Sequence, residues 1–193
     1  MSNRTVLLIA VVGCLTIPSA LANKKEDLAV ASTVEMFKEA RATEPFFKGA
    51  FGYAVFPAIG KGGIGFGGAF GKGQVFRKGD YVGDTSMTQI TIGFQLGGQA
   101  YSQIIFFEDE PAFQNFTSGN FEFGAQVSAV ALTAGVEASA GTAGTTAGAS
   151  TSEDSSHATT DYNLGMAVFI IAKGGLMYEA SVGGQKFKYH GKR

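Results

Sequence analysis

The side chains of this chain best suited to bind a ligand are cations beside glycine blocks or near the C-terminal end. A Lys or Arg close to a membrane surface contributes about 1 kcal/mol toward an anionic bilayer, so a cluster of about four matters. The last residues interleave such cations with Phe187 and Tyr189. The candidate lipid-binding residues are Lys61, Lys72, Arg77, Lys78, Lys173, Lys186, Lys188, Lys192 and Arg193.

Catalytic chemistry has little support, because the chain has only two histidines, His157 and His190, and one cysteine, Cys14. Five residues of one low-complexity segment can be drawn as a metal site or a serine nucleophile with its base: Asp154, Ser155, Ser156, His157 and Asp161. A loop without fixed geometry cannot orient metal ligands or hold a base against a nucleophile. We therefore expect no enzyme activity, no cofactor and no metal.

Glycine alternates with Phe, Ile and Val from Gly49 to Gly79. Within this stretch Gly63-x-Gly65-x-x-Gly68 matches a dinucleotide fingerprint, which requires a helix immediately after the glycines. The following residues contain further glycines and a turn at Lys78-Gly79-Asp80, through which a helix does not propagate. Gly71-Lys72 is followed by Gly73 instead of the Ser or Thr of a phosphate loop. The stretch therefore predicts closely packed strands.

Ordered blocks of the chain resemble the SYLF domain, a lipid-binding family, from about Ala29 to Phe187. The blocks are Tyr53-Ala54-Val55-Phe56-Pro57, Lys61 to Gly68, Phe70 to Gly73, Ile92 to Gln99, Glu110 to Phe113, Phe123 to Ser128, Lys173 to Met177 and Val182 to Gly184. The glycines to which we assign a structural role are Gly63, Gly65, Gly67, Gly68, Gly71, Gly97, Gly98, Gly174 and Gly175.

The resemblance implies binding of lipids or a membrane surface, through anionic headgroups or an acyl chain. Relatives in eukaryotes bind phosphoinositides and some bind actin, but only the general lipid class is carried over to this chain. The family has a glycine-proline turn with a nearby basic residue where Leu132 to Glu137 stands here. A headgroup contact at that position is not expected.

Residues 1–22 read as a secretory leader, in which Arg4 precedes the apolar stretch Val6 to Ile17 and an A-x-A signal ends at Ala22. The mature chain would start near Asn23 and be exported to the periplasm. Alternatively, Val11-Val12-Gly13-Cys14 is a lipoprotein box, in which case Cys14 would be acylated and attach the protein to the outer membrane.

The N-terminal part of the mature chain predicts an amphipathic helix from Lys24 to Glu44 that ends before Pro45. A second, short helix is expected over Pro111 to Ser118, with Asp109 or Glu110 as its cap. The acidic run at Glu108, Asp109 and Glu110 suits the positive end of that helix.

Alternation predicts strands in the rest of the chain. We expect a hairpin over Thr88 to Phe107 with its turn at Gly97-Gly98, a strand over Phe121 to Thr133, and a second hairpin formed by Tyr162 to Ile171 and Leu176 to Val182 around Lys173-Gly174-Gly175. Between these strands Ala138 to Thr160 is low in apolar residues and is predicted to be a loop.

These elements predict one α+β domain over residues 23–193, with a twisted, barrel-like antiparallel sheet, an N-terminal amphipathic helix and one short mid-chain helix. The formal net charge of −1 shows no bias toward nucleic acid. A small outer-membrane β-barrel is the alternative class. Its weaknesses are the mid-chain helix and a basic C-terminal end where an apolar closing strand is expected.

Overall fold

The computed structural model describes residues 19–64, 66–92, 97–124, 127, 129–132, 161–174 and 182–192. Most of the predicted leader, with Cys14, lies outside these residues, as do the segment Ala138 to Thr160, Gly65, Gly175 and Arg193.

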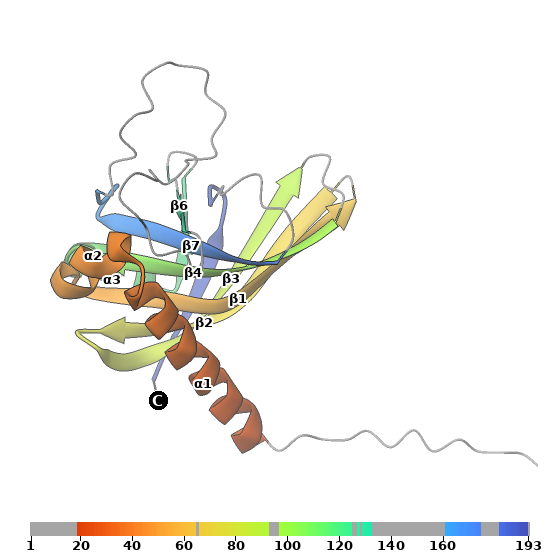
Figure 1. Cartoon of the computed structure of the whole chain (residues 1–193). Helices are drawn as coiled ribbons and strands as arrows, with labels where there is room; N and C mark the ends of the chain where they lie inside the picture. Colours follow the sequence, from red (N-terminus) through yellow and green to blue (C-terminus); the bar gives the residue numbers. More distant parts are fainter. Residues whose placement is uncertain are drawn as a thin grey trace, which may run out of the picture.

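The chain forms one eight-stranded sheet with three α-helices and one 3-10 helix among the described residues (Figure 1). The helices are α1 (Ser19–Lys38), η1 (Arg41–Thr43), α2 (Glu44–Gly49) and α3 (Glu110–Thr117). The strands are β1 (Gly52–Ile64), β2 (Phe66–Arg77), β3 (Asp80–Ile92), β4 (Gly97–Phe107), β5 (Asn120–Glu122), β6 (Ala129–Leu132), β7 (Met166–Gly174) and β8 (Lys186–Gly191). The predicted α+β class is confirmed.

The sheet has the order β5-β8-β3-β2-β1-β4-β7-β6 and is strongly curled. All of its neighbouring strands are antiparallel except β6 and β7, which are parallel. The segment from Glu122 to Ala129 joins the two edge strands and reaches at most about 25 Å when fully extended. A flat sheet of eight strands would place its edges about 34 Å apart. The curl is therefore required by the short connection.

The curl has a local cause in β1, at the centre of the sheet. The register of β1 against both neighbours shifts by one residue around Pro57, which is a β-bulge. Proline lacks a backbone donor and is tolerated in a central strand only at such a bulge. Ser102 donates a hydrogen bond of 2.8 Å to the Pro57 carbonyl oxygen and closes the irregularity from β4.

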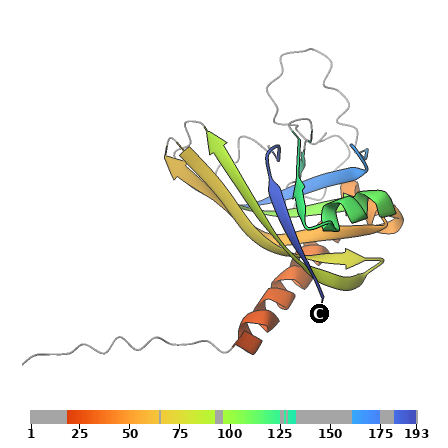
Figure 2. The ribbon, with the colours of Figure 1, turned by 180° about the vertical axis from the view of Figure 1, so that it is seen from behind.

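The two faces of the sheet carry separate apolar clusters. The concave face holds the larger one, which α3 and the segment after β5 complete with Phe113, Phe116 and Phe123. The convex face packs against α1 and α2 (Figure 2). The β7 run Met166–Ile171 alternates between the two clusters, and for this reason it is apolar throughout.

The N-terminal helix begins and ends earlier than predicted: α1 spans Ser19–Lys38, and Pro45 lies in the first turn of α2. Thr43 causes the break, because its hydroxyl donates to the carbonyl oxygens of Phe37 and Ala40. The buried side of α1 is formed by Val30, Thr33, Val34 and Phe37, whereas Leu28 of the same helix is exposed. None of the described helices combines the length and the apolar character that crossing a bilayer requires.

The predicted hairpin from Thr88 to Phe107 is wrong. β3 pairs with β2 and β8, and β4 pairs with β1 and β7, so the two strands are separated in the sheet. Gly97 and Gly98, the predicted turn, are β4 residues opposite Gly63 and Gly62. Two consecutive glycines of β4 thus face two consecutive glycines of β1. Read from the sequence alone, such a Gly-Gly pair resembles a two-residue turn.

The single strand predicted over Phe121 to Thr133 is also wrong, because it consists of β5 and β6 at opposite edges of the sheet. Of the second predicted hairpin, the first strand is β7, whose neighbours are β4 and β6. Leu176 to Ser181 lie outside the described residues. The mid-chain helix is confirmed as α3, and Asp109 caps it by accepting a hydrogen bond of 2.9 Å from the Ala112 amide.

Among the described glycines, the closest backbone approaches in β2 occur at Gly71 and Gly73. A Cβ at Gly73 would overlap the Val55 carbonyl oxygen and lie 2.8 Å from Phe56 Cδ1, and a Cβ at Gly71 would lie 2.6 Å from Ile59 Cγ1. A Cβ at Gly68 would have its nearest neighbour at 3.5 Å, an ordinary contact. Because Gly71 and Gly73 have no side chains, Phe56 and Ile59 of β1 can pack directly against β2.

We predict that Gly73→Ala lowers the free energy of unfolding by about 1 to 3 kcal/mol, because the added methyl group overpacks the centre of the sheet. Urea unfolding followed by circular dichroism measures this change. Gly60→Ala is the matched control in β1, since nothing lies within 4 Å of the added atom, and it should leave stability unchanged or raise it by up to about 1 kcal/mol. Equal losses in the two variants would contradict the close approach.

Candidate functional site

The register of the sheet gathers cations and apolar side chains on one part of the convex face. Directly opposed residues in antiparallel strands point to the same face. Lys188 of β8, Ser86 of β3, Lys72 of β2 and Ala58 of β1 therefore form one transverse row. The next row is Lys186, Thr88, Phe70 and Gly60, and a third consists of Ile90, Gly68 and Gly62. We call these three rows the convex patch.

Three of the cations predicted from the sequence meet in the convex patch: Lys72, Lys186 and Lys188, all of them exposed. Strand geometry separates Lys186 from Lys188 by about 7 Å and Lys188 from Lys72 by about 10 Å. The first separation is within the Debye length of about 8 Å at physiological salt and the second slightly exceeds it, so the three charges act together most strongly at low ionic strength. Lys186 Nζ lies 3.4 Å from Glu122 Oε2, an exposed ion pair of small energy.

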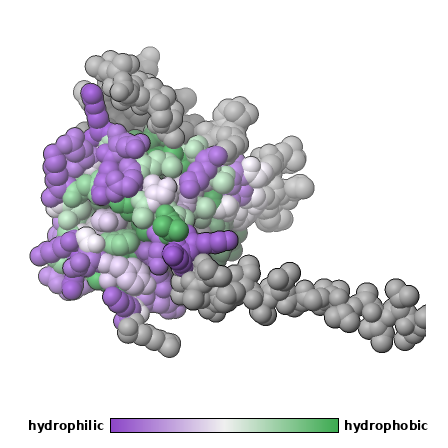
Figure 3. Space-filling model, turned by 60° about the horizontal axis from the view of Figure 1, so that its bottom comes forward, coloured by the Kyte–Doolittle hydropathy of each residue, from purple (hydrophilic) through white to green (hydrophobic). Residues whose placement is uncertain are grey.

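Two large apolar side chains of the convex patch are exposed: Phe70 by 52% and Ile90 by 83%. Sequence reasoning missed both, because each reads as a core position in an alternating strand. The sequence did contain one signal: Phe70 is two residues from Lys72 and four from Gln74, so in a strand it points to the same face as these polar residues. Figure 3 views the molecule with the lower side of Figure 1 brought forward, and apolar and polar residues are intermixed there.

The other predicted cations are not part of this patch. Lys61 points to the same face as the buried Ala69, which is the concave one. Arg77 and Lys78 lie at the opposite end of the β2–β3 hairpin, where Lys78 has φ 51° and its ammonium is 5.7 Å from the Phe51 ring centroid. Lys173 lies near the end of β7. Lys192 follows β8, with its ammonium 5.7 Å from the Tyr81 ring centroid.

The concave side, where an acyl chain would have to be enclosed, is filled by fully buried rings that include Phe56, Phe107, Phe116 and Phe187. Phe116 and Phe187 have ring centroids 5.2 Å apart, and Phe56 and Phe187 5.6 Å. Such aromatic packing stabilises the core beyond its buried area.

A polar group is embedded in this concave core. The amides of Gln103 and Gln185 donate to each other over 2.9 and 3.1 Å, and Gln185 also donates to the Tyr101 hydroxyl over 3.2 Å. Both glutamines are fully buried, so these bonds offset the cost of removing the amides from water. Burial raises the pKa of Tyr101 to about 12, and the hydrogen bond from Gln185 opposes that shift.

Comparison with known proteins agrees with the blocks noted in the sequence. The Ysc84 family model, described as "Las17-binding protein actin regulator", matches residues 88–191. The chain belongs to the Ysc84 (SYLF) family. The matched region runs from the convex patch in β3 to the end of β8.

A relative of this Ysc84-family chain is Beta cell expansion factor A of Aeromonas veronii. The two are 27% identical over 161 residues, which cover 83% of this chain and 54% of that protein. The chain thus spans about half the length of the relative that it matches.

The buried Tyr101 predicts a loss of stability at high pH. Its pKa is raised from 10.0 to about 12, so its contribution is complete below pH 10 and is lost as the pH rises through 12. A shift of this size corresponds to about 2 to 3 kcal/mol. Urea unfolding between pH 9 and 12 should show that Tyr101→Phe loses less stability over this range than the unchanged chain. Tyr162→Phe is the comparison: burial and then Glu108 raise the pKa of Tyr162 as well, but by less, so its substitution should have a smaller effect. An equal effect of the two substitutions would refute the assignment.

Proposed function

We propose that this Ysc84-family chain is a non-enzymatic domain that binds the surface of anionic membranes through the convex patch. The observation that carries the proposal is the register that places Lys72, Lys186 and Lys188 on one exposed face with Phe70 and Ile90. Cations draw such a face to anionic headgroups, and exposed apolar side chains gain free energy on leaving water.

The surface mode is favoured over enclosure of an acyl chain. The rings and amides of the concave core already contact one another, so a chain entering there would have to displace Phe56 or Phe187. The convex patch needs no such rearrangement. Its rows extend over about 14 Å both across and along the strands. The β5 carboxylate that continues the second row, Glu122, forms an exposed ion pair with Lys186. By contrast, Lys72 and Lys188 have no opposed carboxylate among the described residues of their row.

The setting that we propose is outside the cytoplasm, in the periplasm of a bacterial envelope, after removal of residues 1–22. Attachment to the outer membrane through Cys14 is the alternative. The support is the leader pattern in the sequence. We propose lipids or a membrane surface as the partner, with no nucleic acid and no cofactor.

Sedimentation with liposomes tests the electrostatic part of the proposal. Replacing Lys72, Lys186 and Lys188 together with Gln should weaken binding to anionic liposomes by about 100-fold, because each cation contributes about 1 kcal/mol. The salt dependence of binding should flatten as well, since fewer charges remain to be screened. A Phe70→Ser and Ile90→Ser double variant should weaken binding with little change in the salt dependence.

The matched control replaces three exposed cations outside the convex patch: Arg41, Lys48 and Lys78 with Gln. It removes the same charge and should leave binding close to that of the unchanged chain. Equal weakening by the two triple variants would show that net charge, and not the patch, determines binding. Equal binding of the unchanged chain to neutral and anionic liposomes at low salt would also contradict the proposal.

A further inference from the structure

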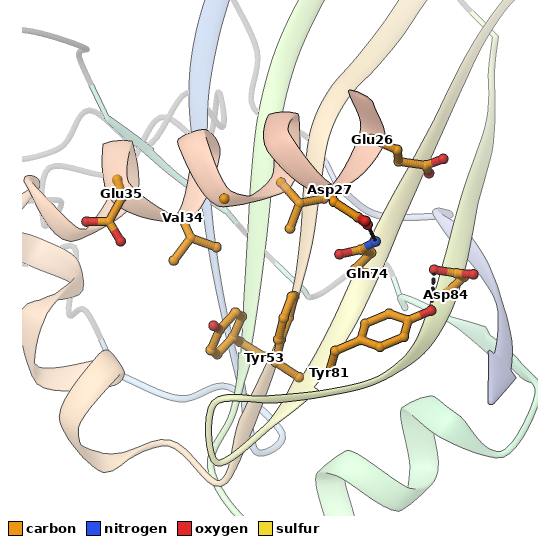
Figure 4. A pocket seen from close by; sticks show the side chains of 11 residues that line it. Glu26, Asp27, Val34, Glu35, Tyr53, Gln74, Tyr81 and Asp84 are labelled. Carbon is orange, nitrogen blue, oxygen red and sulfur yellow. Dashed lines mark hydrogen bonds between the residues drawn. The ribbon is translucent and has the colours of Figure 1, made fainter. Parts of the chain in front are cut away.

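A second feature of the convex face is a groove between α1 and strands β1 to β3, with a volume of about 650 Å³ (Figure 4). One wall is apolar and comes from α1 through Val30, Ala31 and Val34. Gln74 of β2 donates a hydrogen bond of 2.8 Å to Asp27 and ties this helix to the sheet. The groove therefore has fixed walls on both sides.

The opposite wall is aromatic. The Tyr53 and Phe76 rings are stacked with centroids 5.0 Å apart and an interplanar angle of 19°. Phe76 and Tyr81 follow edge to face, with centroids 6.1 Å apart. Faces of aromatic rings attract cations through their quadrupole.

The charged residues that line the groove are all acidic: Glu26, Asp27, Glu35 and Asp84. The negative charges of Asp27, Glu35 and Asp84 raise the pKa of the two tyrosines in the aromatic wall further than burial alone does. Burial raises the pKa of Tyr81 to about 12, and the hydrogen bond to Asp84 and the charges of Asp84 and Asp27 add to the shift. The pKa of Tyr53 is raised by burial and then by Glu35. A negative potential therefore extends along the aromatic wall.

Tyr81 already takes part in one cation–π contact within the folded chain. The Lys192 ammonium, from the end of the chain, lies 5.7 Å from the Tyr81 ring centroid. A metal ion suits the groove less well, because no three His, Cys, Asp or Glu side chains among the described residues are arranged to hold one. Carboxylates that are spread around aromatic and apolar walls fit a cation that carries alkyl groups.

We propose that the groove binds a small alkylammonium ion, with its charge against Tyr53 and Tyr81 and its alkyl groups against the α1 wall. Glu35 and Asp84 supply charge neutralisation from opposite sides, since one belongs to α1 and the other to β3. Lys192 and His190 are the neighbouring bases, the latter opposite Asp84 in the sheet. The inference does not depend on membrane binding by the convex patch.

Calorimetric titration of the full chain with choline tests the proposal. The neutral isostere 3,3-dimethyl-1-butanol is the matched ligand. Choline should bind and the alcohol should not. Asp84→Asn and Tyr53→Leu should each weaken choline binding by about 3- to 30-fold, the range expected for cation–π and nearby charge interactions.

Glu39→Gln is the control variant, because Glu39 is an exposed carboxylate of the same region that does not line the groove. It should bind choline as the unchanged chain does, and thermal melting checks that all variants are folded. Binding of the alcohol as tightly as choline, no binding of choline, or equal weakening by Glu39→Gln would each overturn the proposal. Tighter binding of calcium than of choline would do so as well, since it would identify a metal site.

Discussion

The structure depends on the bend at the centre of the sheet. There β2 has glycines in place of side chains, and β1 has one extra residue at its bulge. Gly71 and Gly73 leave two neighbouring positions on the concave face of β2 without Cβ atoms, and the bulge at Pro57 turns Phe56 and Ile59 of β1 over that gap. The bend allows the short segment from Glu122 to Ala129 to connect the edge strands β5 and β6. It also divides the side chains into an inner face with the main core and an outer face against which α1 and α2 pack.

The outer face is covered unevenly, and this unevenness accounts for both proposed sites. Near α1 the rows of the sheet present Asp84 and Gln74, which border the acidic groove. One row further along, Ser86 and Lys72 begin the convex patch, which is basic and apolar. An anionic surface attracts the second region and repels the first, so a domain bound through the convex patch would be tilted, with the patch nearer the lipid than the groove.

Local sequence signals were sufficient to predict helix α3 and most strand segments, but not which strands pair with one another. Asp109 and Pro111 marked the start of α3, because capping depends on neighbouring residues alone. Strand pairing is non-local, so Gly97-Gly98 looked like a turn while pairing across the sheet with Gly63 and Gly62. The lysines were visible in the sequence, but which of them share a face follows from register. Phe70 and Ile90 could not be separated from core residues by type, since the exposure of an outer position depends on which other elements pack over it.

The most direct test of the account uses the absence of tryptophan from the chain. A tryptophan placed at Ile90 would be the sole indole in the convex patch, and one placed at Leu164, which is also highly exposed, would report from outside it. With anionic vesicles that carry brominated lipids, the account predicts a blue shift and quenching of the Ile90→Trp fluorescence and no change for Leu164→Trp. Quenching at Leu164→Trp with none at Ile90→Trp would contradict the central claim that the uncovered convex face contacts the membrane.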